Sequence, residues 1–209
     1  MIVSKAEQGS FEWLFERVAV VTGTRVKDIV TPAKLQLSKS SKDLILKLID
    51  EKITGISSES TFVSDAMERG SNLEDQAKEE YTKRTGIVMM DFGLCISKDN
   101  KMHGLSPDGF TEDLTGGVEI KCPSYTHLKY ITGEKSIYNE YKPQCINYFL
   151  VNKKLEWLDT VSFRPEFYPN PIYIKRITRE EIKEDIELVE VAMDEFFKEY
   201  NNKFTELTF

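Results

Sequence analysis

Two acidic residues and a lysine near the middle of the chain have the types and spacing of a site that hydrolyses phosphodiesters. Asp108 is followed after ten residues by Glu119, and Lys121 comes two positions later, which gives the pattern D-x10-E-x-K. In a strand over 118–121, alternation of side chains turns Glu119 and Lys121 to one face and Ile120 to the core on the other. The spacing therefore predicts two carboxylates with a lysine beside them.

Two carboxylates and a free backbone carbonyl make a hard oxygen site of the kind that suits Mg²⁺, which also accepts substrate phosphate as a ligand. Phosphodiester hydrolysis needs an in-line nucleophile and neutralisation of charge in the transition state, and metal ions supply both. Lys121 would orient or deprotonate the attacking water and screen the developing charge. A bare pattern of this length also fits the solvent-exposed face of an ordinary amphipathic hairpin.

Hydrophobic spacing predicts the elements that position these residues. A helix capped by Ser40 or Ser41 has the apolar stripe Leu44, Ile45, Leu48, Ile49 and Ile53. Further helices are expected over 64–84, over 138–151 with Pro143 in the first turn, and after a capping box formed by Thr178 and Glu181. Strands are expected over 87–90, 94–97, 102–105, 118–121, 157–163 and 172–177.

The turn before the central strand and one further acid also follow from spacing. Gly116 and Gly117 are expected to let the chain return into the strand that carries Glu119. On the helix over 64–84, Glu74 falls on the same side as Gly70 and the buried residues, so its carboxylate needs a partner.

The order of these elements predicts an α/β (α+β) fold with a mixed central β-sheet flanked by helices. At 209 residues and 40% hydrophobic, the chain is expected to form a single domain over 1–209. No segment approaches the roughly 18 apolar residues of a membrane span, and the N-terminus lacks a secretory layout, so a cytoplasmic protein without membrane attachment is expected. Three widely spaced cysteines favour neither structural zinc nor a disulfide framework.

The net charge of −7 is unusual for a protein that binds nucleic acid, but its distribution is uneven. The segment 179–199 has nine acids and three bases, and so contributes −6. The segment 25–47 has six bases, including Arg25, and two acids. A local basic surface is therefore expected within an acidic total.

Four segments resemble the lambda-exonuclease or YqaJ-like viral recombinase family, which belongs to the restriction-endonuclease-like PD-(D/E)XK nuclease superfamily. They are WLFERVAVVTGT at 13–24, MERGSNLE at 67–74, SPDG followed by GGVEIKCP within 106–123, and YKPQCINY at 141–148. These segments occur in the order of the family and span most of the chain. The resemblance implies a restriction-endonuclease-like fold.

Residue by residue, the resemblance implies a metal site and a catalytic group around the D-x10-E-x-K pattern. Asp108, Glu119 and the carbonyl of Ile120 would be metal ligands. Glu74 would be an additional acid at the metal, Lys121 the catalytic lysine, and Gln144 would support the lysine and the scissile phosphate. The cofactor that the resemblance implies is Mg²⁺, as two ions and replaceable by Mn²⁺.

The resemblance also implies a pocket for a terminal 5′-phosphate, formed by Arg17, Thr24 and Ser106. Arginine makes bidentate contacts with phosphate and hydroxyls complete them. Thr24 departs from the family if serine is usual at that position.

The implied function is a 5′-to-3′ exonuclease that acts on double-stranded DNA ends and leaves 3′ overhangs for a single-strand annealing partner. The family implies a homotrimer and a phage or prophage origin within a bacterial host. Two alternatives remain open at this point: a restriction-like or repair endonuclease with the same metal site, and a non-catalytic module that binds DNA ends. The set of Arg17, Thr24 and Ser106 favours the exonuclease, and an intact Asp108, Glu119 and Lys121 argues against the non-catalytic module.

Overall fold

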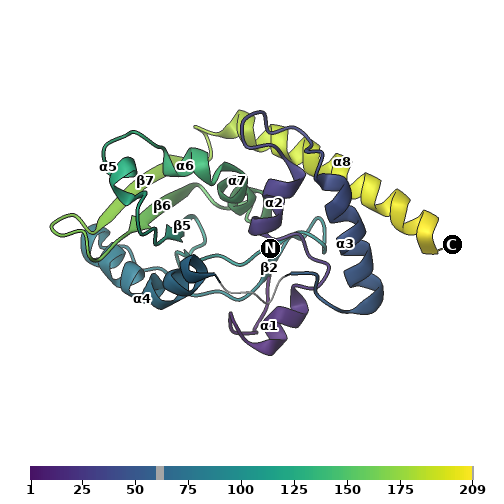
Figure 1. The fold of residues 1–209 in the computed structure, drawn as a ribbon, viewed down its shortest axis with the longest axis horizontal. Coiled ribbons are helices and arrows are strands. Elements are labelled where there is room, and N and C mark those ends of the chain that lie inside the picture. Colours follow the sequence, from purple (N-terminus) through teal and green to yellow (C-terminus); the bar gives the residue numbers. More distant parts are fainter. Residues whose placement is uncertain (60–63, 209) are drawn as a thin grey trace.

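The computed structural model describes residues 1–59 and 64–208, and Figure 1 shows their arrangement. The helices are α1 (Phe11–Glu16), α2 (Gly23–Ile29), α3 (Ser41–Thr54), α4 (Asp65–Thr85), α5 (His127–Ile131), α6 (Ile137–Glu140), α7 (Lys142–Val151) and α8 (Lys183–Thr208). The strands are β1 (Ile2–Val3), β2 (Cys95–Ile96), β3 (Gly104–Leu105), β4 (Gly109–Phe110), β5 (Gly116–Lys121), β6 (Trp157–Phe163) and β7 (Ile172–Thr178).

The principal sheet has the strand order β4-β5-β6-β7. β5 and β6 run parallel, whereas β4 and β7 pair antiparallel with their neighbours, so the mixed sheet expected from the sequence is confirmed. Parallel register places Glu119 opposite Thr160 and Lys121 opposite Ser162. A smaller antiparallel sheet has the order β1-β2-β3.

Helices cover both faces of the principal sheet. Figure 1 shows α4 on one side of β5, β6 and β7, and α6 and α7 on the other. Ala77 and Tyr81 of α4 pack against Val118 and Ile120 of β5. The period of two along β5 therefore turns Glu119 away from α4 and towards α7. The larger core lies on that second side, among α2, α3, α7 and α8.

A buried polar group fixes α4 to the sheet. Tyr81 donates a hydrogen bond of 2.6 Å to Asp159 of β6. Arg176 of β7 donates two hydrogen bonds, each 2.8 Å long, to the same carboxylate and lies 3.7 Å from the centre of the Trp157 ring. Glu74 lies two turns before Tyr81 on α4, so this contact also fixes the helix that carries Glu74.

Two expected elements differ from the structure in more than the position of their ends. The helix over 138–151 is divided at Tyr141, where α6 ends and α7 begins with Pro143 in its first turn. Proline has no N–H for a bond to the preceding turn, so a helix starts there more readily than it continues. The strand over 87–90 is reduced to a single bridge between Met90 and Phe110.

The expected role of the glycine pair before Glu119 is wrong. The turn is made by 111–115, where the Asp113 carboxylate accepts hydrogen bonds from the Thr111 hydroxyl at 2.6 Å and the Thr115 N–H at 3.1 Å. Gly116 and Gly117 lie inside β5. A Cβ on Gly116 would lie 2.1 Å from the Trp157 ring, so glycine is required there by close packing and not by the turn.

Two expectations about surface and core also need correction. The α3 stripe packs in the core at Leu44, Ile45, Leu48 and Ile49, but Ile53 in the last turn is 60% exposed. Arg25 is buried, because both its terminal nitrogens bind Glu51, so it does not contribute to a basic surface.

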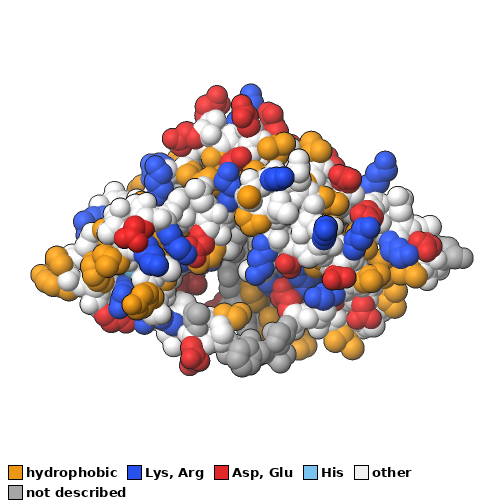
Figure 2. All heavy atoms as spheres, turned by 45° about the horizontal axis from the view of Figure 1, so that its top comes forward, with side chains coloured by type: hydrophobic (Ala, Val, Ile, Leu, Met, Phe, Trp, Pro, Cys, Tyr) orange, Lys and Arg blue, Asp and Glu red, His pale blue; other side chains and the backbone are white. Residues whose placement is uncertain are grey.

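On the face drawn in Figure 2, basic and acidic side chains are interspersed around a central hollow.

Candidate active site

Asp108 binds the backbone of the neighbouring strand. Its Oδ2 accepts a hydrogen bond of 2.6 Å from the N–H of Ile120. β4 pairs with β5 only at Gly117 and Val118, so the edge of β5 beyond Val118 is left without a strand partner on that side. The Asp108 carboxylate takes this place and is thereby fixed beside Glu119 and Lys121.

Glu119 receives two hydrogen-bonding groups on one carboxylate oxygen. Lys121 Nζ lies 2.5 Å from its Oε1, and the side-chain amide of Gln144 donates a 2.6 Å bond to the same oxygen. Glu119 is 1% exposed, whereas the Lys121 side chain is 24% exposed. Lys121 Nζ also lies 4.8 Å from the centre of the Tyr141 ring. The structure thus brings Asp108, Glu119, Lys121 and Gln144 into one site.

The charges in this site perturb one another. Burial raises the pKa of Asp108 well above its usual value, and the nearby charge of Glu119 raises it further. Burial by itself would lower the pKa of Lys121, but the carboxylates of Glu119 and Asp108 outweigh this effect and raise it. Two carboxylates at close range favour a cation between them, and Lys121 supplies only part of the compensating charge.

The donor set fits a divalent ion with oxygen ligands. Glu119 Oε2 is buried and has no hydrogen-bond partner among the described residues, which leaves it available as a ligand. In a strand, the N–H and C=O of one residue point to the same side. Since the N–H of Ile120 points to Asp108 at the open edge of β5, its carbonyl lies on that side as well. Asp108, Glu119 and the Ile120 carbonyl could therefore supply hard oxygen ligands to such an ion.

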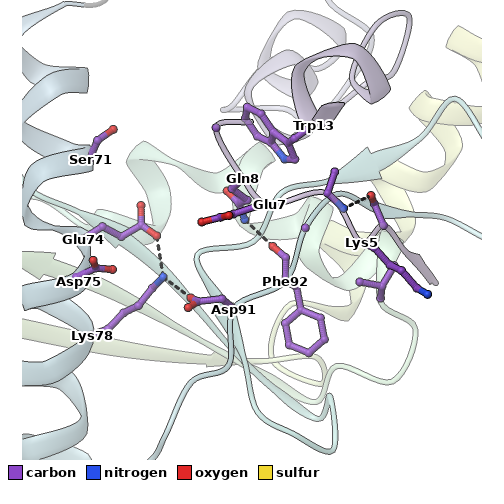
Figure 3. A pocket seen from close by; sticks show the side chains of 15 residues that line it. Lys5, Glu7, Gln8, Trp13, Ser71, Glu74, Asp75, Lys78, Asp91 and Phe92 are labelled. Carbon is purple, nitrogen blue, oxygen red and sulfur yellow. Dashed lines mark hydrogen bonds and ion pairs between the residues drawn. The ribbon is translucent and has the colours of Figure 1, made fainter. Parts of the chain in front are cut away.

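Glu74 comes to this region from α4. In the described part of the chain, no three acidic, histidine or cysteine side chains gather closely enough to hold a metal by themselves. Glu74 instead binds Lys78, which lies 2.9 Å from Glu74 Oε1 and 2.7 Å from Asp91 Oδ1. Figure 3 shows this trio on one wall of a cavity of about 770 Å³, with Trp13 and Gln8 on the other side. The charge of Glu74 reaches Asp108, whose pKa it raises.

Two of the three residues expected at a terminal phosphate are in contact. Arg17 donates a 3.0 Å hydrogen bond from Nη1 to the Ser106 hydroxyl, and its guanidinium carbon lies 4.4 Å from the centre of the Trp13 ring. Ser106 lies two positions before Asp108, so this hydrogen bond joins Arg17 to the segment that carries the acidic site. Thr24 is exposed in the first turn of α2, and no hydrogen bond joins it to Arg17 or Ser106 among the described contacts.

Three residues without a role in the sequence argument hold the site together. Tyr148 accepts a 3.1 Å hydrogen bond from the N–H of Asp108 and donates one of 3.1 Å to the carbonyl of Val118. The amide of Gln8 donates to the carbonyls of Pro107 and Phe92, each at 2.8 Å. A Cβ on Gly23 would lie 3.1 Å from Gln144 Cγ, so the glycine lets Gln144 pack closely against α2. Tyr148 is the last residue of the segment YKPQCINY, so the sequence offers a signal for this tyrosine.

No helix in the described ranges 1–59 and 64–208 is long and apolar enough to cross a membrane. No curated protein matches the chain significantly. Among solved structures, the chain is similar to LHK-Exo in complex with dAMP, with 30% identity, a TM-score of 0.80 and coverage of 95% of this chain and 96% of the other. A second structure is described as the alkaline exonuclease LHK-Exo from Laribacter hongkongensis. It shows 28% identity and a TM-score of 0.74, with coverage of 95% of this chain and 98% of the other.

A phage-related exonuclease from Haemophilus somnus shares the fold at 14% identity, with a TM-score of 0.65 and coverage of 90% of this chain and 96% of the other. These similarities confirm the mixed α/β, restriction-endonuclease-like fold. The model of the YqaJ-like viral recombinase domain matches residues 12–154, which include every predicted site residue. The chain therefore belongs to the YqaJ-like viral recombinase family.

Proposed function

We propose that this protein is a divalent-metal-dependent exonuclease that degrades double-stranded DNA from its 5′ ends and leaves 3′ single-stranded overhangs. Family membership and the similarity to exonuclease structures support nuclease activity. The observation that carries the proposal further is the contact between Arg17 and Ser106. It joins a phosphate-binding arginine to the segment that carries Asp108, as end recognition beside a hydrolytic site requires.

Asp108, Glu119 and the carbonyl of Ile120 would hold the metal, with Glu74 as an additional acid. When bound, Mg²⁺ or Mn²⁺ would polarise the scissile phosphate and the attacking water. The site would hold two ions if Glu74 takes part. The backbone bond from Ile120 fixes Asp108, and the amide of Gln144 fixes Glu119. The protein thus contributes carboxylates that need little reorganisation before the reaction.

Lys121 would act as a charged group. Because the surrounding carboxylates raise its pKa, it keeps its proton at neutral pH. A protonated lysine orients the attacking water through its N–H donors and stabilises the negative charge that develops on the phosphate. Because a protonated lysine cannot accept a proton, the task of Lys121 would be orientation and charge stabilisation and not proton abstraction.

Arg17, with Ser106 and Thr24, would hold the terminal 5′-phosphate. An end phosphate fixed at Arg17 places the following phosphodiester over the acidic site, so that positioning assists the chemistry. Such a pocket favours an exonuclease over a restriction-like endonuclease, which needs no group for a terminus. From family membership we further propose a homotrimer, a single-strand annealing partner and a cytoplasmic location in a bacterial host.

The test is digestion of linear duplexes that carry a 5′-phosphate or a 5′-hydroxyl, in Mg²⁺ and in chelator. Wild-type protein should degrade the phosphorylated end faster and only with the metal. Arg17→Ala should slow digestion of phosphorylated ends about 10- to 150-fold, the effect of one charge-assisted bidentate contact. Arg84→Ala, which removes an exposed arginine at the end of α4, is the matched control.

Two results would contradict the proposal. Equal preference for phosphorylated ends in wild type and Arg17→Ala would remove the end pocket and favour an endonuclease. Undiminished cleavage in chelator would remove the metal requirement. Light scattering with and without DNA tests the homotrimer separately, since a monomer in both conditions contradicts only that part.

A further inference from the structure

The arginine proposed to bind the end phosphate already contacts a carboxylate. Arg17 Nη2 lies 3.3 Å from Oε2 of Glu59. The other oxygen of Glu59 accepts a hydrogen bond of 3.0 Å from Nε of Arg25. One carboxylate therefore bridges two arginines, and it lies on the group that would receive the phosphate.

The placement of Glu59 is enforced by its neighbours. Arg25 directs its two terminal nitrogens to Glu51, at 2.9 and 2.7 Å, which leaves Nε for Glu59. Glu51 also accepts hydrogen bonds from the N–H of Ser58 at 2.8 Å and from its hydroxyl at 2.5 Å. Ser58 immediately precedes Glu59, so the buried Glu51 fixes the backbone that presents Glu59 to Arg17.

The two glutamates differ in how easily they can leave. The cluster of Arg17, Arg25, Glu51 and Glu59 has no net charge, because it contains two arginines and two glutamates. Glu51 has no exposed side-chain surface and is saturated with hydrogen bonds, whereas the Glu59 side chain is 36% exposed. Exposed ion pairs contribute little because water and salt screen them, so Glu59 is the displaceable member.

Arg17 also has capacity for a further acceptor. Its Nε is buried and has no acceptor among the described residues, although Nη1 and Nη2 are engaged by Ser106 and Glu59. A phosphate has several oxygens and carries a charge between −1.5 and −2 at neutral pH when it is a terminal monoester. It can therefore replace the single charge of Glu59 and also reach the remaining donor.

We propose that Glu59 is an intramolecular competitor that occupies Arg17 in the free protein and is displaced by the terminal phosphate of the DNA. This inference rests on the proposed role of Arg17 in end binding. While Glu59 is in place, Arg17 carries no net attraction for the singly charged phosphodiesters of the DNA backbone. The dianionic end phosphate displaces Glu59, and the return of Glu59 assists release of that phosphate.

The experiment measures binding of a short blunt duplex with 5′-phosphate or 5′-hydroxyl ends in chelator, where cleavage does not interfere. Fluorescence anisotropy gives the dissociation constants for wild type, Glu59→Gln, Arg17→Ala and the double variant. Glu59→Gln should tighten binding of the phosphorylated duplex by roughly 3- to 30-fold, between the effects of an exposed ion pair and of a charge-assisted hydrogen bond. Binding of the hydroxyl-ended duplex should change less.

The double variant separates competition from general charge. If Glu59 acts through Arg17, Glu59→Gln has no effect on end preference once Arg17 is alanine. Glu206→Gln is the matched control, because Glu206 is an exposed glutamate in a 3.0 Å ion pair with Lys203 near the C-terminal end of α8. Glu59→Ala, which removes the carboxylate altogether, should behave as Glu59→Gln does.

The outcomes distinguish this inference from the proposed function. In one outcome, Arg17→Ala abolishes end preference while both Glu59 variants leave binding of phosphorylated ends unchanged. That result would overturn competition by Glu59 and leave the phosphate pocket at Arg17 supported. The competitor is also overturned if Glu206→Gln tightens binding as much as Glu59→Gln. If Arg17→Ala keeps the wild-type preference, the pocket itself fails and the role of Glu59 with it.

Discussion

The side-chain amide of Gln144 and the carboxylate of Glu119 are joined by a hydrogen bond of 2.6 Å. The bond connects α7 to β5, and on its other side Gln144 packs against Gly23 of α2. The orientation of the Glu119 carboxylate therefore depends on how two helices pack. In the proposed mechanism, Gln144 acts through Glu119 as a positioning residue.

Glu119→Gln should lower the single-turnover rate of DNA cleavage by roughly 10²- to 10⁴-fold, because it removes the charge of a proposed metal ligand. Duplex binding should stay within a few-fold of wild type, since general affinity comes from many backbone contacts. Gln144→Ala keeps the charge of Glu119 and should have a smaller effect on the rate. Near wild-type cleavage by Glu119→Gln would show that the active site lies elsewhere.

If Glu74 is the additional acid of the proposed metal site, Lys78→Ala should raise the Mg²⁺ concentration needed for half-maximal cleavage by roughly tenfold, the scale of a lost outer contact to a ligand. Lys78 lies between Glu74 and Asp91, and its loss leaves these two acids to repel each other. Lys78→Arg should largely restore the wild-type requirement. Lys83→Ala is the control, because Lys83 is exposed and pairs with Glu79 one turn further along α4. A lower Mg²⁺ requirement in Lys78→Ala would mean that Lys78 merely repels the cation.

The sequence predicts those features of the site that depend on residues a few positions apart in one element. Alternation along 118–121 settles that Glu119 and Lys121 share a face, because a strand has a period of two wherever it lies. The structure agrees, with Ile120 in the core on the side of α4. The cap formed by Thr178 and Glu181 was likewise predictable, since its two hydrogen bonds join residues three positions apart.

The rest of the site depends on contacts between segments that are distant in the chain. Tyr148 reaches the N–H of Asp108 across 40 residues, and Gln8 reaches the carbonyl of Pro107 across 99. No local pattern encodes such pairs, because sheet register and helix packing decide them together. The same holds for Arg25, whose charge predicts a surface position, whereas the fold pairs it with the buried carboxylate of Glu51.

Gly116→Ala should destabilise the protein by about 1–3 kcal/mol or more, because a Cβ there would lie 2.1 Å from the Trp157 ring. Gly70→Ala is the matched substitution inside α4, where the added Cβ meets nothing within 4 Å. It should stabilise the protein by about 0.5–1 kcal/mol, the difference in helix propensity. Urea unfolding of both variants gives the two free energies, and equal effects would contradict the close packing of Gly116.

Glu51→Gln should lower the free energy of unfolding by about 3 kcal/mol at pH 7, and the loss should depend on pH. Burial by itself would raise the pKa of Glu51, but hydrogen bonds from Arg25 and Ser58 outweigh it and lower the pKa from 4.5 to about 2. A shift of this size corresponds to about 3 kcal/mol of linked stability. Because the folded-state pKa is the lower one, this stability is fully present above about pH 4.5 and disappears as the pH falls towards 2. The difference between wild type and Glu51→Gln should therefore shrink over that interval, as urea unfolding at a series of pH values would measure.

Glu134→Gln, at an exposed position, should show little difference at any pH. A constant difference between wild type and Glu51→Gln down to pH 2 would mean that shape and not charge explains the loss.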